Sequence, residues 1–317
     1  MDAWVPWLLS GLGLVILLLA GDALVKGAVN LSLRLGVPAL IVSLTIVAFG
    51  TSAPELLISI NAILADTPGL ALGNVVGSNT ANILLVLGVP ALLATMHTSQ
   101  CETRREFNFM IAASILFIAL AFRGVFDWIA ALILLAALAG LLTYSFVEAR
   151  KHRAAGADSE EEVEGADPSI AWWKIAVYLA LGLMGLPLGA DLLVDNATVI
   201  AKTYGVSDTV IGLTLVALGT SLPELATTVM AALRRQADVA LGNVIGSNMF
   251  NLLAIIGVAS LVGPITVAPE FLTFDLWVML GASILLVPFV YFRQDLTRIW
   301  GIVLTALYLA YILIVLN

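Results

Sequence analysis

Two glutamates are the residues in this sequence best suited to chemistry. Glu55 follows Gly-Thr-Ser-Ala-Pro, and Glu224 follows Gly-Thr-Ser-Leu-Pro. Each lies deep inside a long apolar stretch, where an ionised carboxylate costs at least a few kcal/mol unless its charge is compensated. The sequence therefore predicts that each glutamate is either protonated or meets a cation. A neutral glutamate that hydrogen-bonds a neighbouring helix is the alternative.

The segments around these glutamates offer oxygen ligands. Calcium takes about 6–8 oxygen ligands with flexible geometry, whereas the lack of Cys and His in these segments disfavours zinc and copper. No Lys or Arg stands at comparable depth, so the missing positive charge is predicted to be a transported ion. The hydroxyl and amide candidates are Thr51, Ser52, Ser78, Asn82, Thr220, Ser221, Ser247 and Asn251. For Asn74, Asn79, Asn243 and Asn248, bonding between helices is an equal alternative.

A proline stands directly before each glutamate. Pro54 and Pro223 have no N–H, and each ring clashes with the carbonyl four residues earlier. Both helices are predicted to bend or break there, which frees carbonyls that cannot face lipid but can face a buried ion. Two G-x-x-x-G spacings, Gly73 to Gly77 and Gly242 to Gly246, predict close helix packing, with unwinding near the site as the alternative.

The composition indicates that lipid surrounds most of this chain. The 317 residues are 61% hydrophobic and 11% charged, against about 45–50% and about 25% in soluble domains. A spanning helix needs about 20 mostly apolar residues. Ten stretches qualify: 4–25, 38–64, 70–94, 107–122, 125–148, 170–194, 206–233, 238–262, 272–292 and 296–316.

The basic residues predict the orientation of these spans. Twelve of the fourteen Lys and Arg residues fall on one side of the ten-span arrangement, and only Arg123 and Lys202 fall on the other. Basic loops face the cytoplasm, so both termini are predicted to lie outside the cell membrane. Residues 149–169 form a predicted acidic cytoplasmic linker between a first half, 1–148, and a second half, 170–317. No basic tract suggests nucleic acid as a partner.

The two halves contain an internal repeat. Residues 36–88 begin GVPALIVSLTIVAFGTSAPELL, and residues 205–257 begin GVSDTVIGLTLVALGTSLPELA, an offset of 169 residues without a gap. Upstream, Asp22 aligns with Asp191. The copies start an odd number of spans apart, so they are predicted to cross the membrane in opposite directions. The predicted fold is therefore an all-α membrane protein of ten helices, built as two inverted five-helix repeats with broken helices at the midplane. Duplication without transport is the alternative.

The paired motifs resemble the α-repeats of the calcium/cation antiporter superfamily. They read GTSAPE at 50–55 and GTSLPE at 219–224, with GNVVGSN at 73–79 and GNVIGSN at 242–248. Within the superfamily the chain is similar to the prokaryotic sodium/calcium exchangers, over both repeats and the ten-span layout but not over the acidic linker. The resemblance implies that the first and sixth helices slide past a fixed core.

The resemblance also implies a set of ion ligands. Glu55 and Glu224 would bind calcium, and the Thr and Ser before each proline would line sodium sites. The Ser and Asn of the other motif complete the implied set, as do two backbone carbonyls. In full, the set is Ala48, Thr51, Ser52, Glu55, Ser78, Asn82, Ala217, Thr220, Ser221, Glu224, Ser247 and Asn251.

The predicted function is antiport of Ca²⁺ against Na⁺ by alternating access, with these ions and the lipid bilayer as partners. We expect that the protein is not an enzyme and that it needs neither a cofactor nor an obligatory protein partner. Some exchangers carry Asp where this chain has Asn251, so Ca²⁺/H⁺ exchange and K⁺-dependent Na⁺/Ca²⁺ exchange stay open as alternatives. A passive channel and an intramembrane hydrolase are the alternatives from other classes, although the motifs contain no nucleophile–base pair.

Overall fold

The computed structural model describes residues 4–154, 169–205 and 217–315, and most of them are helical. The first half contains α1 (Val5–Leu35), α2 (Ala39–Val42), η1 (Ser43–Val47), α3 (Ala48–Thr51), α4 (Ala53–Leu64), α5 (Pro68–Ala81), η2 (Asn82–Val86), α6 (Gly88–Leu93), η3 (Thr98–Gln100), α7 (Arg104–Ala121), β1 (Val125–Phe126) and α8 (Trp128–Ala154).

The second half follows the order of the first as far as α14 in the part that the structure describes, and then differs, because its strand stands before the next long helix rather than after it. It contains α9 (Trp172–Thr203), α11 (Ala217–Gly219), α12 (Leu222–Leu233), α13 (Ala237–Phe250), η5 (Asn251–Ile255), α14 (Ile256–Val262), β2 (Ile265–Thr266), η6 (Phe271–Asp275), α15 (Leu276–Ile284), α16 (Val287–Tyr291) and α17 (Arg298–Val315). Strands β1 and β2 pair antiparallel across the two halves.

Several helices are long and apolar enough to cross a membrane. Within the described ranges there are seven, or eight if the bent pair Ala39–Thr51 and Ala53–Leu64 forms one span. Two of the ten predicted spans are not in that count. Helix α7 covers the stretch 107–122 but begins with Arg104, Arg105 and Glu106, and the stretch 206–233 lies partly outside the described residues. The ten-span inverted repeat therefore stays a prediction.

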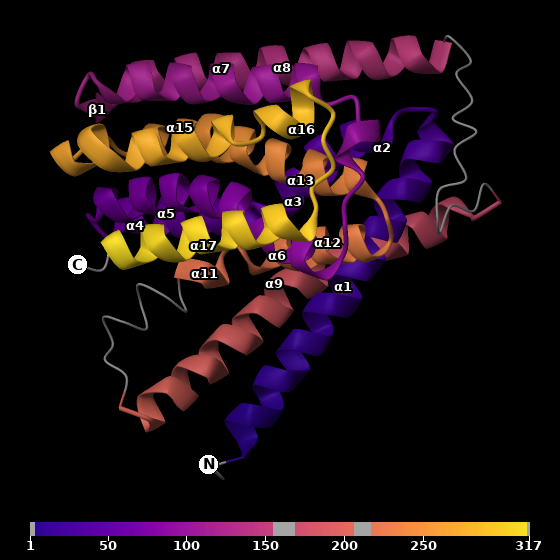
Figure 1. The fold of residues 1–317 in the computed structure, drawn as a ribbon. Helices are drawn as coiled ribbons and strands as arrows, with labels where there is room; N and C mark the ends of the chain where they lie inside the picture. Colours follow the sequence, from indigo (N-terminus) through magenta and orange to yellow (C-terminus); the bar gives the residue numbers. More distant parts are fainter. Residues whose placement is uncertain (1–3, 155–168, 206–216, 316–317) are drawn as a thin grey trace.

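The helices form a stacked bundle from which one pair projects (Figure 1). The axes of helices α7, α8, α15, α5 and α17 are roughly aligned, whereas α1 and α9 lie side by side and extend beyond the bundle together. Glycines allow this close approach. A Cβ on Gly13 would lie 2.7 Å from the backbone nitrogen of Leu193, and a Cβ on Gly182 would lie 2.5 Å from the Cβ of Leu24.

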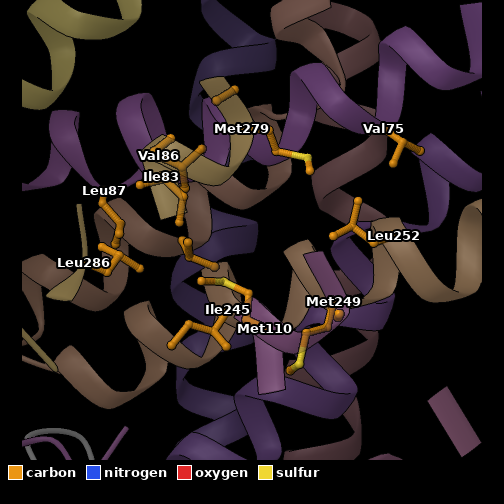
Figure 2. Packing of buried hydrophobic residues seen from close by; sticks show 14 of the residues in the cluster. Val75, Ile83, Val86, Leu87, Met110, Ile245, Met249, Leu252, Met279 and Leu286 are labelled. Atoms are coloured by element: carbon orange, nitrogen blue, oxygen red, sulfur yellow. The ribbon is translucent and has the colours of Figure 1, made fainter. Parts of the chain in front are cut away.

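Helix α13 lies at the centre of the bundle, and each of its residues is buried except Asp238. Figure 2 shows Ile245 and Met249 of α13 among side chains from other helices, including Met110 of α7 and Leu252 of η5. Because lipid tails are as apolar as these side chains, the bundle depends on van der Waals packing rather than on transfer out of water. This tight packing fixes the position of the polar residues that α13 carries.

Glycines on α13 bring it against the segment that leads to Glu55. A Cβ on Gly242 would lie 2.9 Å from the carbonyl oxygen of Leu40, and a Cβ on Gly246 would lie 2.5 Å from that of Leu44. The predicted close packing is confirmed for Gly242 and Gly246. It is not confirmed for Gly73 and Gly77, because among the described residues an added Cβ would meet only Phe271, 3.8 Å from Gly73, and nothing within 4 Å of Gly77. The residues aligned with Leu40 and Leu44 in the second half are 209 and 213, outside the described residues.

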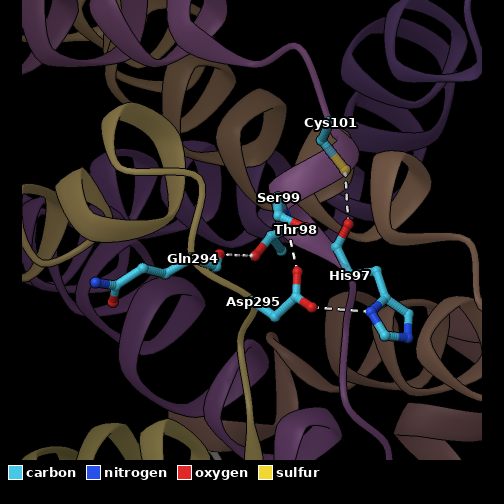
Figure 3. A network of polar contacts seen from close by, with 6 residues as sticks. All are labelled: His97, Thr98, Ser99, Cys101, Gln294 and Asp295. Atoms are coloured by element: carbon cyan, nitrogen blue, oxygen red, sulfur yellow. Dashed lines mark hydrogen bonds and ion pairs between the residues drawn. The ribbon is translucent and has the colours of Figure 1, made fainter.

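Hydrogen bonds join the loop after α6 to the loop before α17 (Figure 3). Met96 and Leu296 exchange backbone hydrogen bonds of 3.1 and 3.0 Å. Asp295 accepts from the Ser99 backbone N–H at 3.0 Å and lies 2.9 Å from Nδ1 of His97. Partial burial alone would raise the pKa of Asp295, but the hydrogen bonds from Ser99 and His97 outweigh it and hold the pKa below its ordinary value.

The predicted linker lies mostly outside the described residues. Helix α8 continues to Ala154, so the first six residues of the stretch 149–169 are helical rather than part of a loop. Residues 155–168, which carry the acidic run, belong to the part of the chain that the structure does not describe.

Candidate functional site

The site begins where two helices break. Helix α3 ends at Thr51, Ser52 has φ −85° and ψ 4°, and α4 starts at Ala53 with a bend of 41° between the two segments. In the second half Ser221 has nearly the same conformation, φ −88° and ψ 1°, and α12 starts at Leu222. The breaks that the prolines predicted are confirmed, two to three residues before each proline.

Both glutamates lie in the first turn of the helix that follows the break. The first N–H groups of a helix have no partner within the helix, and the helix dipole favours negative charge there. Glu55 and Glu224 are each only 1% exposed. The sequence therefore places each carboxylate at a position that the local backbone already favours for an anion.

The two carboxylates belong to the same buried region, because Ser52, three residues before Glu55, hydrogen-bonds Glu224. Among the described residues, neither forms an ion pair, and one oxygen of each, Oε2, has no hydrogen-bond partner. Buried polar atoms are nearly always hydrogen-bonded, and a buried unpaired charge is costly. Two such oxygens on neighbouring acids are what a cation site requires.

Hydroxyl groups cross from the first half to the second. Ser52 Oγ donates to Glu224 Oε1 at 3.3 Å, and Thr51 Oγ1 lies 3.5 Å from Ser247 Oγ. Thr51 also donates to the carbonyl oxygen of Ala48 at 3.3 Å. The structure thus brings together Ala48, Thr51, Ser52, Ser247 and Glu224, five residues of the predicted set.

The asparagines of the other motif mark a second irregularity, which the sequence did not predict. Asn82 begins the π-helical turn η2, and Asn251 begins the π-helical turn η5. Single π-helical turns occur frequently at functional sites. Within the described residues, Oδ1 of Asn82 and both side-chain polar atoms of Asn251 lack hydrogen-bond partners although both residues are buried. These oxygens are available as ligands.

The remaining predicted residues lie near the same breaks. Ser78 is buried on α5, one helical turn before Asn82. Thr220 and Ser221 stand between α11 and α12, with Ser221 buried and Thr220 half-buried. Ala217 begins α11 at the edge of the described residues.

Two asparagines contact each other as symmetry mates would. Asn79 donates from Nδ2 to the carbonyl oxygen of Asn248 at 3.1 Å, and Asn248 donates from Nδ2 to that of Asn79 at 3.3 Å. These residues are 169 positions apart, which is the offset of the sequence repeat. Reciprocal contacts between equivalent residues are what a two-fold axis produces.

A helical membrane protein with buried carboxylates at two equivalent helix breaks belongs to the class of membrane ion transporters. The family model described as sodium/calcium exchanger protein matches residues 5–147 and 174–317, so the chain belongs to the sodium/calcium exchanger family.

Curated relatives and a solved structure agree with this assignment. The chain is 37% identical to the putative antiporter CaxA of Alkalimonas amylolytica, over 86% of each chain. It is 34% identical to the sodium/calcium exchanger MaX1 of Methanosarcina acetivorans, over 98% of each. A structure of the sodium-calcium exchanger NCX_Mj soaked with Na⁺ and Sr²⁺ matches 98% of both chains, with a TM-score of 0.83 and 31% identity. The chain is therefore a multi-pass membrane antiporter of calcium and other cations, in a family of transporters rather than enzymes.

Proposed function

We propose that this chain exchanges Ca²⁺ against Na⁺ by alternating access, and that Glu55 and Glu224 bind the ions. The observation that carries the proposal is the pair of buried carboxylates, each with one oxygen unpartnered among the described residues. Two negative charges balance one Ca²⁺. Sodium ions bound at the same carboxylates and at neighbouring hydroxyls would replace it, and three sodium ions would make the cycle electrogenic.

The remaining ligands in this proposal are the hydroxyls, amides and carbonyls around the two breaks. Ser52 and Thr51 come from the first half and contact Glu224 and Ser247 of the second half. A site shared between two halves can change its access when the halves shift. The names of MaX1 and NCX_Mj as sodium/calcium exchangers support sodium as the counter-ion.

The proposal includes the inverted arrangement of the halves, 1–148 and 170–317, with both termini outside and the acidic linker in the cytoplasm. The reciprocal contact of Asn79 and Asn248 supports a two-fold axis through the site. Helices α1 and α9 are the moving pair in this proposal. Their glycine-lined contact with each other and their projection from the bundle support movement as one unit (Figure 1).

Calcium-45 uptake into proteoliposomes tests the function. We expect an outward Na⁺ gradient to drive uptake, whereas H⁺ and K⁺ gradients imposed without Na⁺ should not. Glu55→Gln and Glu224→Gln should each abolish Na⁺-driven uptake, and Glu270→Gln, at an exposed glutamate, should match the unsubstituted protein. Uptake that ignores Na⁺ and follows a pH gradient would establish Ca²⁺/H⁺ exchange instead.

A further inference from the structure

Asn243 joins α13 to the turn that carries Glu224. Its amide nitrogen, Nδ2, donates to the backbone carbonyl oxygen of Glu224 at 3.4 Å and to Thr228 Oγ1 at 3.2 Å. Thr228 Oγ1 in turn donates to that same carbonyl oxygen at 2.7 Å. Asn243 and Thr228 are fully buried. The three groups form a closed triangle in the first turns of α12.

This triangle fixes the direction of the Asn243 amide. A carbonyl oxygen can only accept, and the Thr228 hydroxyl has already given its hydrogen to that carbonyl. The side of the amide that faces them must therefore be the NH₂ group. The amide oxygen, Oδ1, points the other way, where it accepts from Thr51 Oγ1 at 3.3 Å.

Thr51 is where this direction affects the ion site. Its hydroxyl has one hydrogen but three acceptors within reach: the Ala48 carbonyl oxygen at 3.3 Å, Asn243 Oδ1 at 3.3 Å and Ser247 Oγ at 3.5 Å. A cation held by Ala48 and Ser247, which both belong to the proposed ligand set, engages two of these acceptors. Asn243 Oδ1 then remains to receive the hydrogen, and the lone pairs of Thr51 face the cation.

The first half contains the two corresponding contacts of its asparagine. Asn74 Nδ2 donates to the carbonyl oxygen of Glu55 at 3.2 Å and to Ser59 Oγ at 3.2 Å. Asn74, Glu55 and Ser59 align with Asn243, Glu224 and Thr228 at the repeat offset. Because the asparagine contacts recur at both glutamates, we attribute them to the function of each half rather than to local packing in one of them.

We propose that Asn243 is a positioning residue for the transported cation. It does not coordinate the ion. It directs the Thr51 hydrogen away from the ion and holds the turn of Glu224 in place. The inference rests on the proposed function, since it takes Thr51 and Glu224 as ion ligands.

The test is a double-mutant cycle read by equilibrium binding of ⁴⁵Ca²⁺ to the purified full-length protein. The variants are Asn243→Ala, Thr51→Val and both together, and binding does not depend on which ion drives transport. Asn196→Ala is the matched control, because Asn196 is also buried but its amide donates to Leu192 of its own helix. Should Asn243→Ala not fold, Asn243→Ser, whose hydroxyl is too short to reach Thr51, takes its place.

Asn243→Ala is expected to weaken calcium binding by about threefold to tenfold, as the loss of one hydrogen bond does. With Thr51 already changed to Val, the same substitution should weaken binding clearly less, because the bond it removes is absent. The inference is overturned if the double variant weakens calcium binding by the full product of the two single effects. It is also overturned if Asn243→Ala binds calcium as tightly as Asn196→Ala. Failure of Na⁺ to drive calcium uptake into proteoliposomes would refute the proposed function separately. The double-mutant cycle could still be interpreted, because it measures calcium binding alone.

Discussion

Gly246 is the position where one added methyl group should disturb the ion site most clearly. A Cβ at Gly246 would lie 2.5 Å from the carbonyl oxygen of Leu44 and 2.6 Å from the Cβ of Ala48. Ordinary contact begins at 3.4 Å, so Gly246→Ala requires a separation of about 0.9 Å between α13 and the segment that leads to Glu55. Neither contact is the end of a flexible side chain that could move aside.

The separation should affect both stability and binding. Overpacking in a well-packed interior costs about 1–3 kcal/mol, from which the better helix propensity of Ala subtracts at most about 1 kcal/mol. Calcium–oxygen distances span only about 2.3–2.6 Å. A shift of about 0.9 Å between Ala48 on one side and Ser247 on the other therefore exceeds what the coordination tolerates. We expect a loss of exchange of about a hundredfold, by analogy with other misplacements of this size.

The assay combines thermal unfolding in detergent with Na⁺-driven ⁴⁵Ca²⁺ uptake. Gly140→Ala on α8 is the matched control, because nothing described lies within 4 Å of its added Cβ. That variant should unfold at the same or a higher temperature and should transport normally. A Gly246→Ala protein with an unchanged melting temperature and unchanged uptake would refute the reasoning. It would mean that α13 and the segment before Glu55 can accommodate the added methyl group without moving apart.

The remaining predictions concern charges outside the ion site. Asp22→Asn should lower the free energy of unfolding by about 1–2 kcal/mol, because Asp22 pairs with Arg234 and lies 3.0 Å from Lys26. Asp191→Asn, at the aligned position, should not destabilise the protein when thermal unfolding is compared, because it removes one of two like charges four residues apart. Asp295→Asn should lower the free energy of unfolding at pH 7 by under about 1 kcal/mol, which a slightly lower melting temperature would show. The pKa of Asp295 is lowered in the folded protein, so its contribution is present above pH about 4 and lost as the pH falls through the lowered value. A melting difference between the two proteins that persists unchanged at acidic pH would contradict this assignment.

The sequence predicted the parts of this protein that local chemistry controls. A proline cannot donate a backbone hydrogen bond and therefore disrupts a helix when it stands in the interior, so Pro54 and Pro223 were enough to predict both breaks. A carboxylate in an apolar stretch needs compensation in any fold, which singled out Glu55 and Glu224. The family assignment also follows from the motifs, because each pairs a break with an acid at one fixed spacing.

The tertiary structure decided which groups meet across the two halves. Nothing local to Thr51 indicates that it contacts Asn243 and Ser247, which lie more than 190 positions away, and no residue preference predicts π-helical turns at Asn82 and Asn251. The sequence left Asn74, Asn79, Asn243 and Asn248 open between ion binding and packing because an amide serves both equally well. Their partners depend on how α5 and α13 pack, and that packing depends on contacts made only after distant segments come together.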